Sequence, residues 1–171
     1  MPHLTAVLGD ITRLEVDAVV NAANRSLAPG GGVCGAIHAA AGPQLAQACR
    51  RAGPCPTGEA RLTPGYHLPA RWVIHTVGPV WHGGGQGEAQ ALASAYRNAL
   101  ARAREAGAAS VAFPAISTGI YGYPLAEATT VAVTTVRQEV ERWGEPEEVI
   151  FACFGREVLE AYRGCGVEVV P

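Results

Sequence analysis

The sequence predicts an α/β protein in which a central mixed, mostly parallel sheet is covered by helices on both faces. Short apolar runs of strand length alternate along the chain with segments whose apolar residues recur every three or four positions. One run, DAVVNA at 17–22, is apolar along nearly its whole length, which is typical of a parallel strand buried on both faces. No repeat or low-complexity segment interrupts this order. We therefore expect one three-layer α/β/α domain over residues 1–171.

The first half of the chain predicts four strands and one interrupted helix. The opening run HLTAVLGDI indicates a first strand that ends at Gly9-Asp10. The helix is expected to break at Gly42-Pro43, because glycine and proline interrupt helices. The expected strands are 3–11, 17–22, 58–65 and 72–78, and the interrupted helix is 33–52.

The second half predicts two long helices, one short helix and three strands. Apolar residues at Leu92, Ala95 and Ala99 define one helical face, and Gly107 supplies a stop signal. Pro114 marks the end of a buried strand, and Pro124 suits the first turn of the helix that follows. The expected helices are 88–107, 125–143 and 155–164, and the expected strands are 110–117, 147–154 and 167–170.

Composition and charge exclude several classes of protein. Apolar residues make up 49% of the chain and charged residues 16%, which indicates a folded chain. No apolar run approaches the roughly 18 residues of a membrane span, and MPHLTAVLGD lacks a signal-peptide pattern. Five cysteines without a CxxC pair favour a reducing compartment, so we expect a cytoplasmic protein. A net charge of −2 without a basic run argues against nucleic-acid binding, including RNA binding.

A first glycine loop lies between the second expected strand and the first helix, in NAANRSLAPGGGVCGAIHAAAG at 21–42. Gly30, Gly32 and Gly35 formally fit the G-x-G-x-x-G dinucleotide motif, but that motif requires glycines directly after the strand. An NAD-dependent dehydrogenase is therefore disfavoured. A glycine run that opens a helix still presents free N–H groups to a phosphate. The alternative is a tight turn capped by the asparagines.

A second loop, ISTGIYGYP at 116–124, repeats this arrangement after a buried strand and before a helix. Its two tyrosines add flat, amphipathic walls. In open α/β sheets, ligands bind at the carboxyl ends of the strands. Two such loops on one sheet therefore predict a pocket for a ligand with two phosphates.

The chain resembles a macro domain of the MacroD type, an ADP-ribose-binding module. The resemblance implies a macro fold that binds ADP-ribose and hydrolyses ADP-ribosyl esters on acidic side chains and O-acetyl-ADP-ribose to ADP-ribose. It implies ADP-ribosylated proteins as partners, and it implies no metal or redox cofactor. We also expect the protein to be a monomer that does not associate with a membrane. The matching segments are GDI at 9–11, VDAVVNAAN at 16–24, GGGVCGAIHAAAG at 30–42, CPTGEARLTPGYHLPARWVIHTVGPVW at 55–81 and VAFPAISTGIYGYP at 111–124.

The resemblance also implies roles for individual residues. Asp10 would accept a hydrogen bond from the adenine amino group, and Phe154 would pack against the adenine. Taken alone, Asp10 suits a helix cap and Phe154 a core position. Asn24 would contact the distal ribose, with Asn21 in support. The full ligand-binding set is Asp10, Ile11, Asn21, Ala22, Asn24, Gly31, Gly32, Val33, Ser117, Thr118, Gly119, Ile120, Tyr121 and Phe154.

Cys34 departs from the family pattern, because members that remove ADP-ribose from proteins commonly carry an aspartate there. A thiol is mostly protonated at neutral pH and is a poor general base. Cys34 can act as a base if it is a thiolate. The helix N-terminus and an imidazolium at His38, four residues further along the chain, would favour that form. Alternatively, the water is activated by the substrate's own diphosphate, with Asn24 supplying geometry. The expected catalytic set is Asn24, Cys34 and His38.

Two alternatives remain for this position. Cys34 can be a small, inert residue beside the glycines, which would make the chain a reader that binds ADP-ribose without turnover. A metal site at Cys34 and His38 would need a further ligand, and no other cysteine or histidine has zinc spacing.

His75, within an expected strand, is predicted to be a buried and hydrogen-bonded imidazole.

Overall fold

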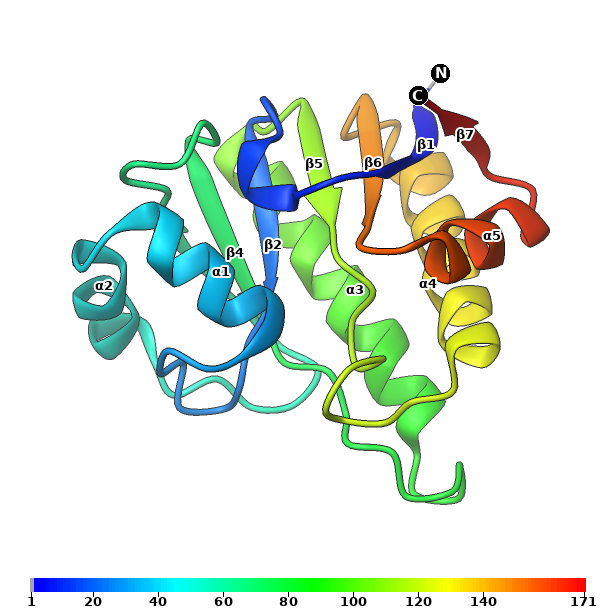
Figure 1. Cartoon of the computed structure of the whole chain (residues 1–171), viewed down its shortest axis with the longest axis horizontal. Helices are drawn as coiled ribbons and strands as arrows, with labels where there is room; N and C mark the ends of the chain where they lie inside the picture. The colour runs from blue at the N-terminus through cyan, green and yellow to red at the C-terminus, as the bar shows by residue number, and fades with distance from the viewer. Residues whose placement is uncertain (1) are drawn as a thin grey trace.

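The computed structural model describes residues 2–171 and contains one seven-stranded sheet with the order β3-β4-β2-β5-β6-β1-β7 (Figure 1). All neighbouring strands are parallel except β3, which runs antiparallel to β4 at one edge. The predicted mixed, mostly parallel sheet is therefore confirmed. The strands are β1 (His3–Leu8), β2 (Ala18–Ala22), β3 (Ala60–Pro64), β4 (Trp72–Thr76), β5 (Ser110–Phe113), β6 (Glu148–Cys153) and β7 (Glu168–Val170).

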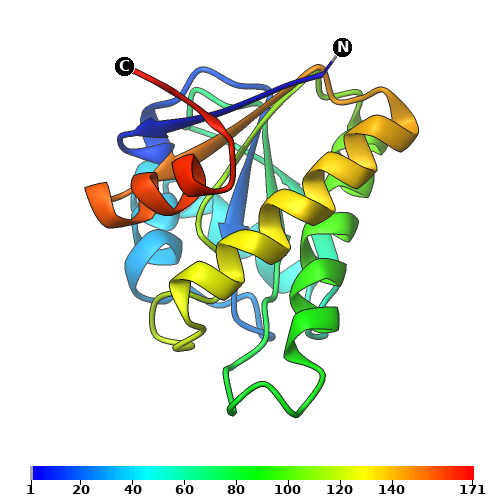
Figure 2. The same cartoon turned by 90° about the vertical axis from the view of Figure 1, so that its right-hand side faces the viewer.

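Helices cover both faces of this sheet, as the sequence predicts. Helices α1 and α2 pack on one face, and α3 and α4 pack on the other (Figures 1 and 2). The α3/α4 side holds the larger aromatic core, in which Phe151 of β6 lies between Phe113 and Tyr162. The helices are α1 (Gly32–Ala41), α2 (Gln44–Ala52), α3 (Glu88–Ala106), α4 (Leu125–Trp143) and α5 (Arg156–Gly164).

Most element boundaries follow the local signals in the sequence. Helix α3 ends at Ala106 and is capped by Gly107, which takes the left-handed conformation with φ 71° and donates to carbonyls of the last turn. The predicted break at Gly42-Pro43 separates α1 from α2. Strand β5 ends at Phe113, directly before Pro114, so it is shorter than the expected 110–117. Helix α4 has the bounds that its apolar periodicity predicts.

The first strand differs from the prediction. Strand β1 ends at Leu8, and a short 3-10 helix, η1 (Ile11–Arg13), follows it. The cause is a local cap, because the Asp10 carboxylate accepts hydrogen bonds from the N–H and the hydroxyl of Thr12. The expected strand 3–11 is therefore wrong at its carboxyl end.

The strand order brings together loops that are far apart in the sequence. Strand β2 pairs with β5, so the segments after Ala22 and after Phe113 leave the same edge of the sheet side by side (Figure 1). Strands β6 and β1 come next, which places Phe154 and Gly9 further along this edge. Among residues 2–171, no helix combines the length and the apolar character that a membrane crossing requires.

Candidate functional site

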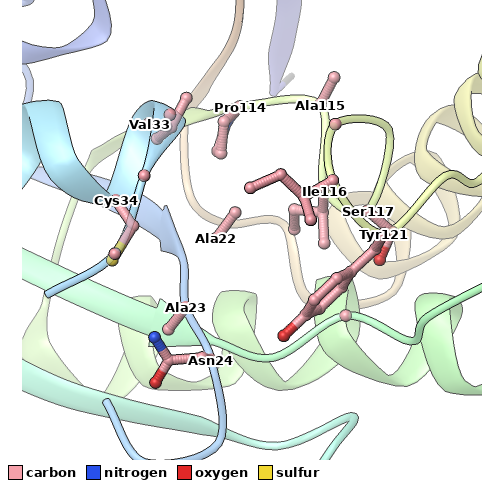
Figure 3. A pocket seen from close by; sticks show the side chains of 16 residues that line it. Ala22, Ala23, Asn24, Val33, Cys34, Pro114, Ala115, Ile116, Ser117 and Tyr121 are labelled. Carbon is pink, nitrogen blue, oxygen red and sulfur yellow. The ribbon is translucent and has the colours of Figure 1, made fainter. Parts of the chain in front are cut away.

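A pocket of about 200 Å³ opens at the carboxyl ends of β2 and β5, where the sequence predicts a ligand site (Figure 3). Its walls come from the segment after β2, from the start of α1, from the segment after β4 and from the loop after β5. The lining residues are Ala22, Ala23, Asn24, Gly30, Gly31, Gly32, Val33, Cys34, Gly78, Pro114, Ala115, Ile116, Ser117, Gly119, Ile120 and Tyr121.

Many of the residues singled out in the sequence meet in this pocket. Both predicted glycine loops contribute to the walls, and Asn24 and Cys34 lie on the same side (Figure 3). Sequence reasoning missed Gly78, although a glycine at the carboxyl end of the expected strand 72–78 was a usable signal. The remaining lining residues outside the expected set are Ala23, Gly30, Pro114, Ala115 and Ile116.

The start of helix α1 forms one wall of the pocket. The first N–H groups of any helix have no intrahelical acceptor, and here the N-cap is Gly31, which has no side chain to cap them. Gly32 has φ +56°, a conformation that favours glycine. A Cβ at Gly30 would lie 3.5 Å from Nδ2 of Asn24 and 3.7 Å from Sγ of Cys34. The glycine run therefore opens a helix N-terminus to an anion and lies in contact distance of the side chains of Asn24 and Cys34.

Asn24 is fixed in place by its own loop. Its Oδ1 accepts hydrogen bonds from the Ser26 hydroxyl at 2.8 Å and from the Ala28 N–H at 3.1 Å. Its Nδ2 donates to the Ala28 carbonyl at 2.9 Å. These bonds hold the amide at the pocket wall in one orientation, which suits a residue that positions a ligand.

The loop after β5 forms the opposite wall. Ser117 takes a left-handed conformation with φ 69°, and its buried hydroxyl has no partner among residues 2–171. A side chain at Gly78 would collide with Ser117 and Ile116, so glycine is required at that position. Tyr121 crosses the pocket with its hydroxyl directed towards the side where Asn24 lies (Figure 3). Backbone strain and an unpaired hydroxyl at one pocket residue indicate a functional loop.

Cys34 lies in the first turn of α1, where its sulfur meets a buried polar side chain. Asn21 is 1% exposed, and its Nδ2 donates to Sγ of Cys34 at 3.7 Å and to Nδ1 of His75 at 3.0 Å. His75 is fully buried and also contacts Oγ1 of Thr63 at 2.9 Å, which confirms the predicted hydrogen-bonded imidazole. Burial, together with the charge of His38, lowers the pKa of His75 to about 3.

His38 lies outside the pocket. It is absent from the lining, and its buried Nε2 has no partner within residues 2–171. Its ring lies 6.5 Å from that of His75, and burial lowers the pKa of His38. A neutral imidazole at neutral pH does not supply the imidazolium that the thiolate hypothesis invoked.

The residues expected at the adenine end also lie outside the pocket, at the neighbouring strand ends. Phe154 follows β6 and is 73% exposed, and Asp10 and Ile11 follow β1, which pairs with β6. Hydrogen bonds from Thr12 lower the pKa of Asp10, whose carboxylate serves as the cap of η1. Thr118 is the one member of the predicted loop 117–121 that does not line the pocket, and its hydroxyl donates to Ala115.

These features define an α/β protein with a ligand pocket at the carboxyl ends of its parallel strands. Within residues 2–171, no group of three or more histidine, cysteine, aspartate or glutamate side chains is arranged to hold a metal ion. The chain belongs to the Macro domain family, whose model matches residues 20–132.

Similar proteins include curated relatives and solved structures. The chain is 59% identical over 158 residues to a macro domain-containing protein of Chlorobaculum tepidum, covering 92% of each chain. It is 56% identical over 161 residues to the O-acetyl-ADP-ribose deacetylase of Klebsiella pneumoniae, again covering 92% of each. The Trypanosoma brucei macrodomain in complex with ADP-ribose matches with a TM-score of 0.90 and 44% identity, over 96% of this chain and 69% of that chain. The Oceanobacillus iheyensis macrodomain with ADP matches with a TM-score of 0.88 and 41% identity, over 92% and 87%.

Proposed function

We propose that this macro domain binds ADP-ribose and hydrolyses O-acetyl-ADP-ribose and mono-ADP-ribosyl esters of acidic side chains, releasing ADP-ribose. The observation that carries this proposal is the pocket between two loops, with the uncapped N-terminus of α1 on one side. Such an opening suits a diphosphate. The relatives named O-acetyl-ADP-ribose deacetylase and the macrodomains solved with ADP and ADP-ribose support the same ligand.

The strand order suggests how the ligand lies. We place the diphosphate between the α1 N-terminus and the loop 116–124, and the distal ribose beside Asn24 and Cys34. The adenine then extends over the ends of β6 and β1, towards Phe154, Ile11 and Asp10. The exposed ring of Phe154 offers a stacking surface, and the Oδ2 atom of Asp10 is free of the Thr12 contacts that occupy Oδ1.

The chemistry of the pocket favours activation of water by the substrate itself. The lining residues include no carboxylate and no imidazole, the groups that most often serve as a general base. In our proposal Asn24 positions the water near the ester, and an oxygen of the ligand's diphosphate accepts its proton. The strained loop at Ser117 and the helix N-terminus hold that diphosphate in place.

The competing function is that of a reader that binds ADP-ribose without turnover. The specific observation in its favour is Cys34, which leaves the distal end of the pocket without a carboxylate. Both functions require ADP-ribose binding, and only turnover separates them.

The experiment that tests the proposal measures hydrolysis of O-acetyl-ADP-ribose and release of ADP-ribose from a glutamate-linked ADP-ribosylated protein. We expect wild type to turn over and Asn24→Ala to lose about a hundredfold in rate, because the water is no longer positioned. Cys34→Ala should stay within a few-fold of wild type. Calorimetric titration of ADP-ribose accompanies each variant, so that loss of binding is separated from loss of chemistry.

Other results would point elsewhere. If wild type binds ADP-ribose but does not turn over, and Cys34→Asp gains activity, the chain is a reader and the cysteine is the reason. If none of the proteins binds ADP-ribose, the proposal fails as a whole.

The proposed setting follows from the same site. ADP-ribosylated proteins and O-acetyl-ADP-ribose are the partners that we propose for a monomer in the cytoplasm. The five free cysteines, four of them buried, suit a reducing compartment.

A further inference from the structure

The buried contacts behind Cys34 form a hydrogen-bonded chain with a definite direction. An amide NH₂ can only donate, so Nδ1 of His75 accepts from Asn21 and the ring proton must lie on Nε2. That N–H then donates to Oγ1 of Thr63, whose own hydroxyl donates to the Pro64 carbonyl. The second N–H of the Asn21 amide is thereby left directed at Sγ of Cys34.

This chain makes the sulfur an acceptor at the pocket wall, where the Cys34 thiol in turn donates to the Ala28 carbonyl at 3.8 Å. Asn21 comes from β2 and His75 from β4, and their register pairs the two residues side by side on neighbouring strands. The amide is 1% exposed, so bulk water does not compete with the sulfur for its second N–H. An N–H donor and the first turn of a helix both stabilise a thiolate.

Cys34 is buried like Cys49, Cys55 and Cys153, but of these four cysteines it is the one that lines the pocket. Burial raises the pKa of Cys49 to about 11, with a further contribution from Cys34, and burial raises the pKa of Cys153 to about 11. Burial also raises the pKa of Cys55. The titratable groups of the Cys34 cluster are His38 on its own helix, His75 from β4 and Cys49 from α2. Both imidazoles have a lowered pKa, so neither supplies an imidazolium beside the sulfur at neutral pH, and the Asn21 amide is the polar side chain that positions it.

We propose that Cys34 is a nucleophilic thiol positioned by Asn21 and His75, and that a group added to its sulfur closes the pocket to ADP-ribose. The modifying reagents are small neutral electrophiles that fit a pocket of about 200 Å³. With iodoacetamide, the thiolate forms an S–C bond as the C–I bond breaks and iodide leaves with the electron pair. Asn21 and His75 are positioning residues, and the reactivity of Cys34 does not depend on whether the domain turns over. The effect on ligand binding rests on the proposed function.

The test follows iodoacetamide labelling of each cysteine by peptide mass spectrometry, as a function of pH, in a Cys165→Ser background. We expect Cys34 to label at least about tenfold faster than Cys49, Cys55 and Cys153, since the thiolate is the nucleophile. Labelled protein should lose ADP-ribose binding, and bound ADP-ribose should protect Cys34.

Variants of the chain separate positioning from general stability. His75→Leu and Asn21→Leu should label Cys34 about threefold more slowly near pH 7, with the rate profile moved to higher pH. His75→Gln keeps an acceptor for the Asn21 amide and should restore the wild-type profile. Thr63→Val should give a smaller shift in the same direction. Thr129→Val removes a buried hydroxyl in α4 that does not line the pocket, and is the matched control that should leave the profile unchanged.

Two results would overturn the proposal: equal labelling of Cys34 and the other buried cysteines, or an unchanged profile in folded His75→Leu and Asn21→Leu. If circular dichroism shows that His75→Leu is unfolded, the pH profiles of Asn21→Leu and Thr63→Val test the proposal in its place. If the variants shift the profile but ADP-ribose gives no protection, the positioning stands and the ligand placement under Proposed function is wrong.

Discussion

Ser117 combines a strained backbone with an unpartnered polar side chain at the pocket wall. Its φ of 69° is unfavourable for a residue with a Cβ, and its buried hydroxyl has no partner among residues 2–171. Both features occur at the pocket wall, where we place the diphosphate. The strain is therefore localised where a ligand can compensate it.

We expect Ser117→Gly to have a higher free energy of unfolding than Ser117→Ala by about 0.5 kcal/mol or more, because glycine adopts the left-handed conformation without a steric penalty. Both variants lose the hydroxyl, so both should bind ADP-ribose several-fold more weakly. Urea unfolding and calorimetric titration of the two variants measure these effects. Equal stability of the two variants would show that the backbone at this position carries no strain.

The sequence predicted single residues best where a local motif decides their place. Asn24, Cys34 and the glycines flank one strand and one helix start, so their position in the pocket follows from nearby sequence. His38 shares a helical face with Cys34, but only the N-terminus of α1 borders the pocket. One further turn, roughly 5 Å along the axis, takes His38 beyond the lining. The Asn21–His75 contact depends on the register of β2 and β4, which no local pattern encodes.

Among the elements, the loop before α3 is held by a single carboxylate. Glu88, the first residue of α3, accepts N–H hydrogen bonds from His82, Gly84 and Gln86. Trp81 at the start of this loop donates to the Tyr121 carbonyl and packs on Tyr123, which ties the loop to the pocket. Burial of Glu88 raises its pKa, but these donors outweigh that effect and lower the pKa to about 2.

We expect Glu88→Gln to destabilise the fold at neutral pH and to weaken ADP-ribose binding a few-fold. The carboxylate has its pKa lowered in the folded state, so its contribution is complete above the unfolded value of 4.5 and disappears as the pH falls towards about 2. The difference in the free energy of unfolding between wild type and variant should therefore shrink over that range. Glu105→Gln, which removes an exposed partner of Arg102, is the control. A difference that stays constant with pH would contradict the role of the carboxylate.

The periodic elements were predictable and the short capped one was not. Helices α3 and α4 repeat their apolar residues over 19 residues each, which gives a strong signal. The 3-10 helix η1 has three residues and depends on two hydrogen bonds from Thr12 to Asp10. Its apolar Ile11 extended the strand pattern, so periodicity alone continued β1 too far. The aspartate two residues before a threonine was the signal that indicated a cap.

At the scale of the whole molecule, His75 makes the stability of the fold sensitive to acid. The pKa of His75 is lowered from 6.5 to about 3 in the folded chain. Between these two pH values, the imidazole is protonated in the unfolded chain and stays neutral in the folded chain. Stability attributable to the neutral imidazole is complete above 6.5 and is lost as the pH falls towards 3. His38, whose pKa is also lowered, adds to the loss in the same direction.

The free energy of unfolding should therefore fall between about pH 6 and pH 4, by up to about 1.4 kcal/mol per pH unit from His75 alone. The glutamine in His75→Gln does not titrate, so the free energy of unfolding of this variant should change less steeply with pH over this range. Urea unfolding at several pH values provides the measurement. An identical slope for wild type and variant would show that His75 does not control the acid response.

The position of β1 in the sheet has a consequence for the order in which a newly synthesised chain becomes able to bind. Strand β1 lies between β6 and β7, and its His3 pairs with Glu148, so it has no lasting place until nearly the whole chain has been made. The segments that line the pocket, by contrast, are complete once Tyr121 has emerged. On the ribosome, the segments that line the pocket emerge before the last strands, so in our placement of the ligand the diphosphate end of the site is synthesised before the adenine end. A nascent chain stalled between these points would hold the first strand unpaired, with half of its site assembled.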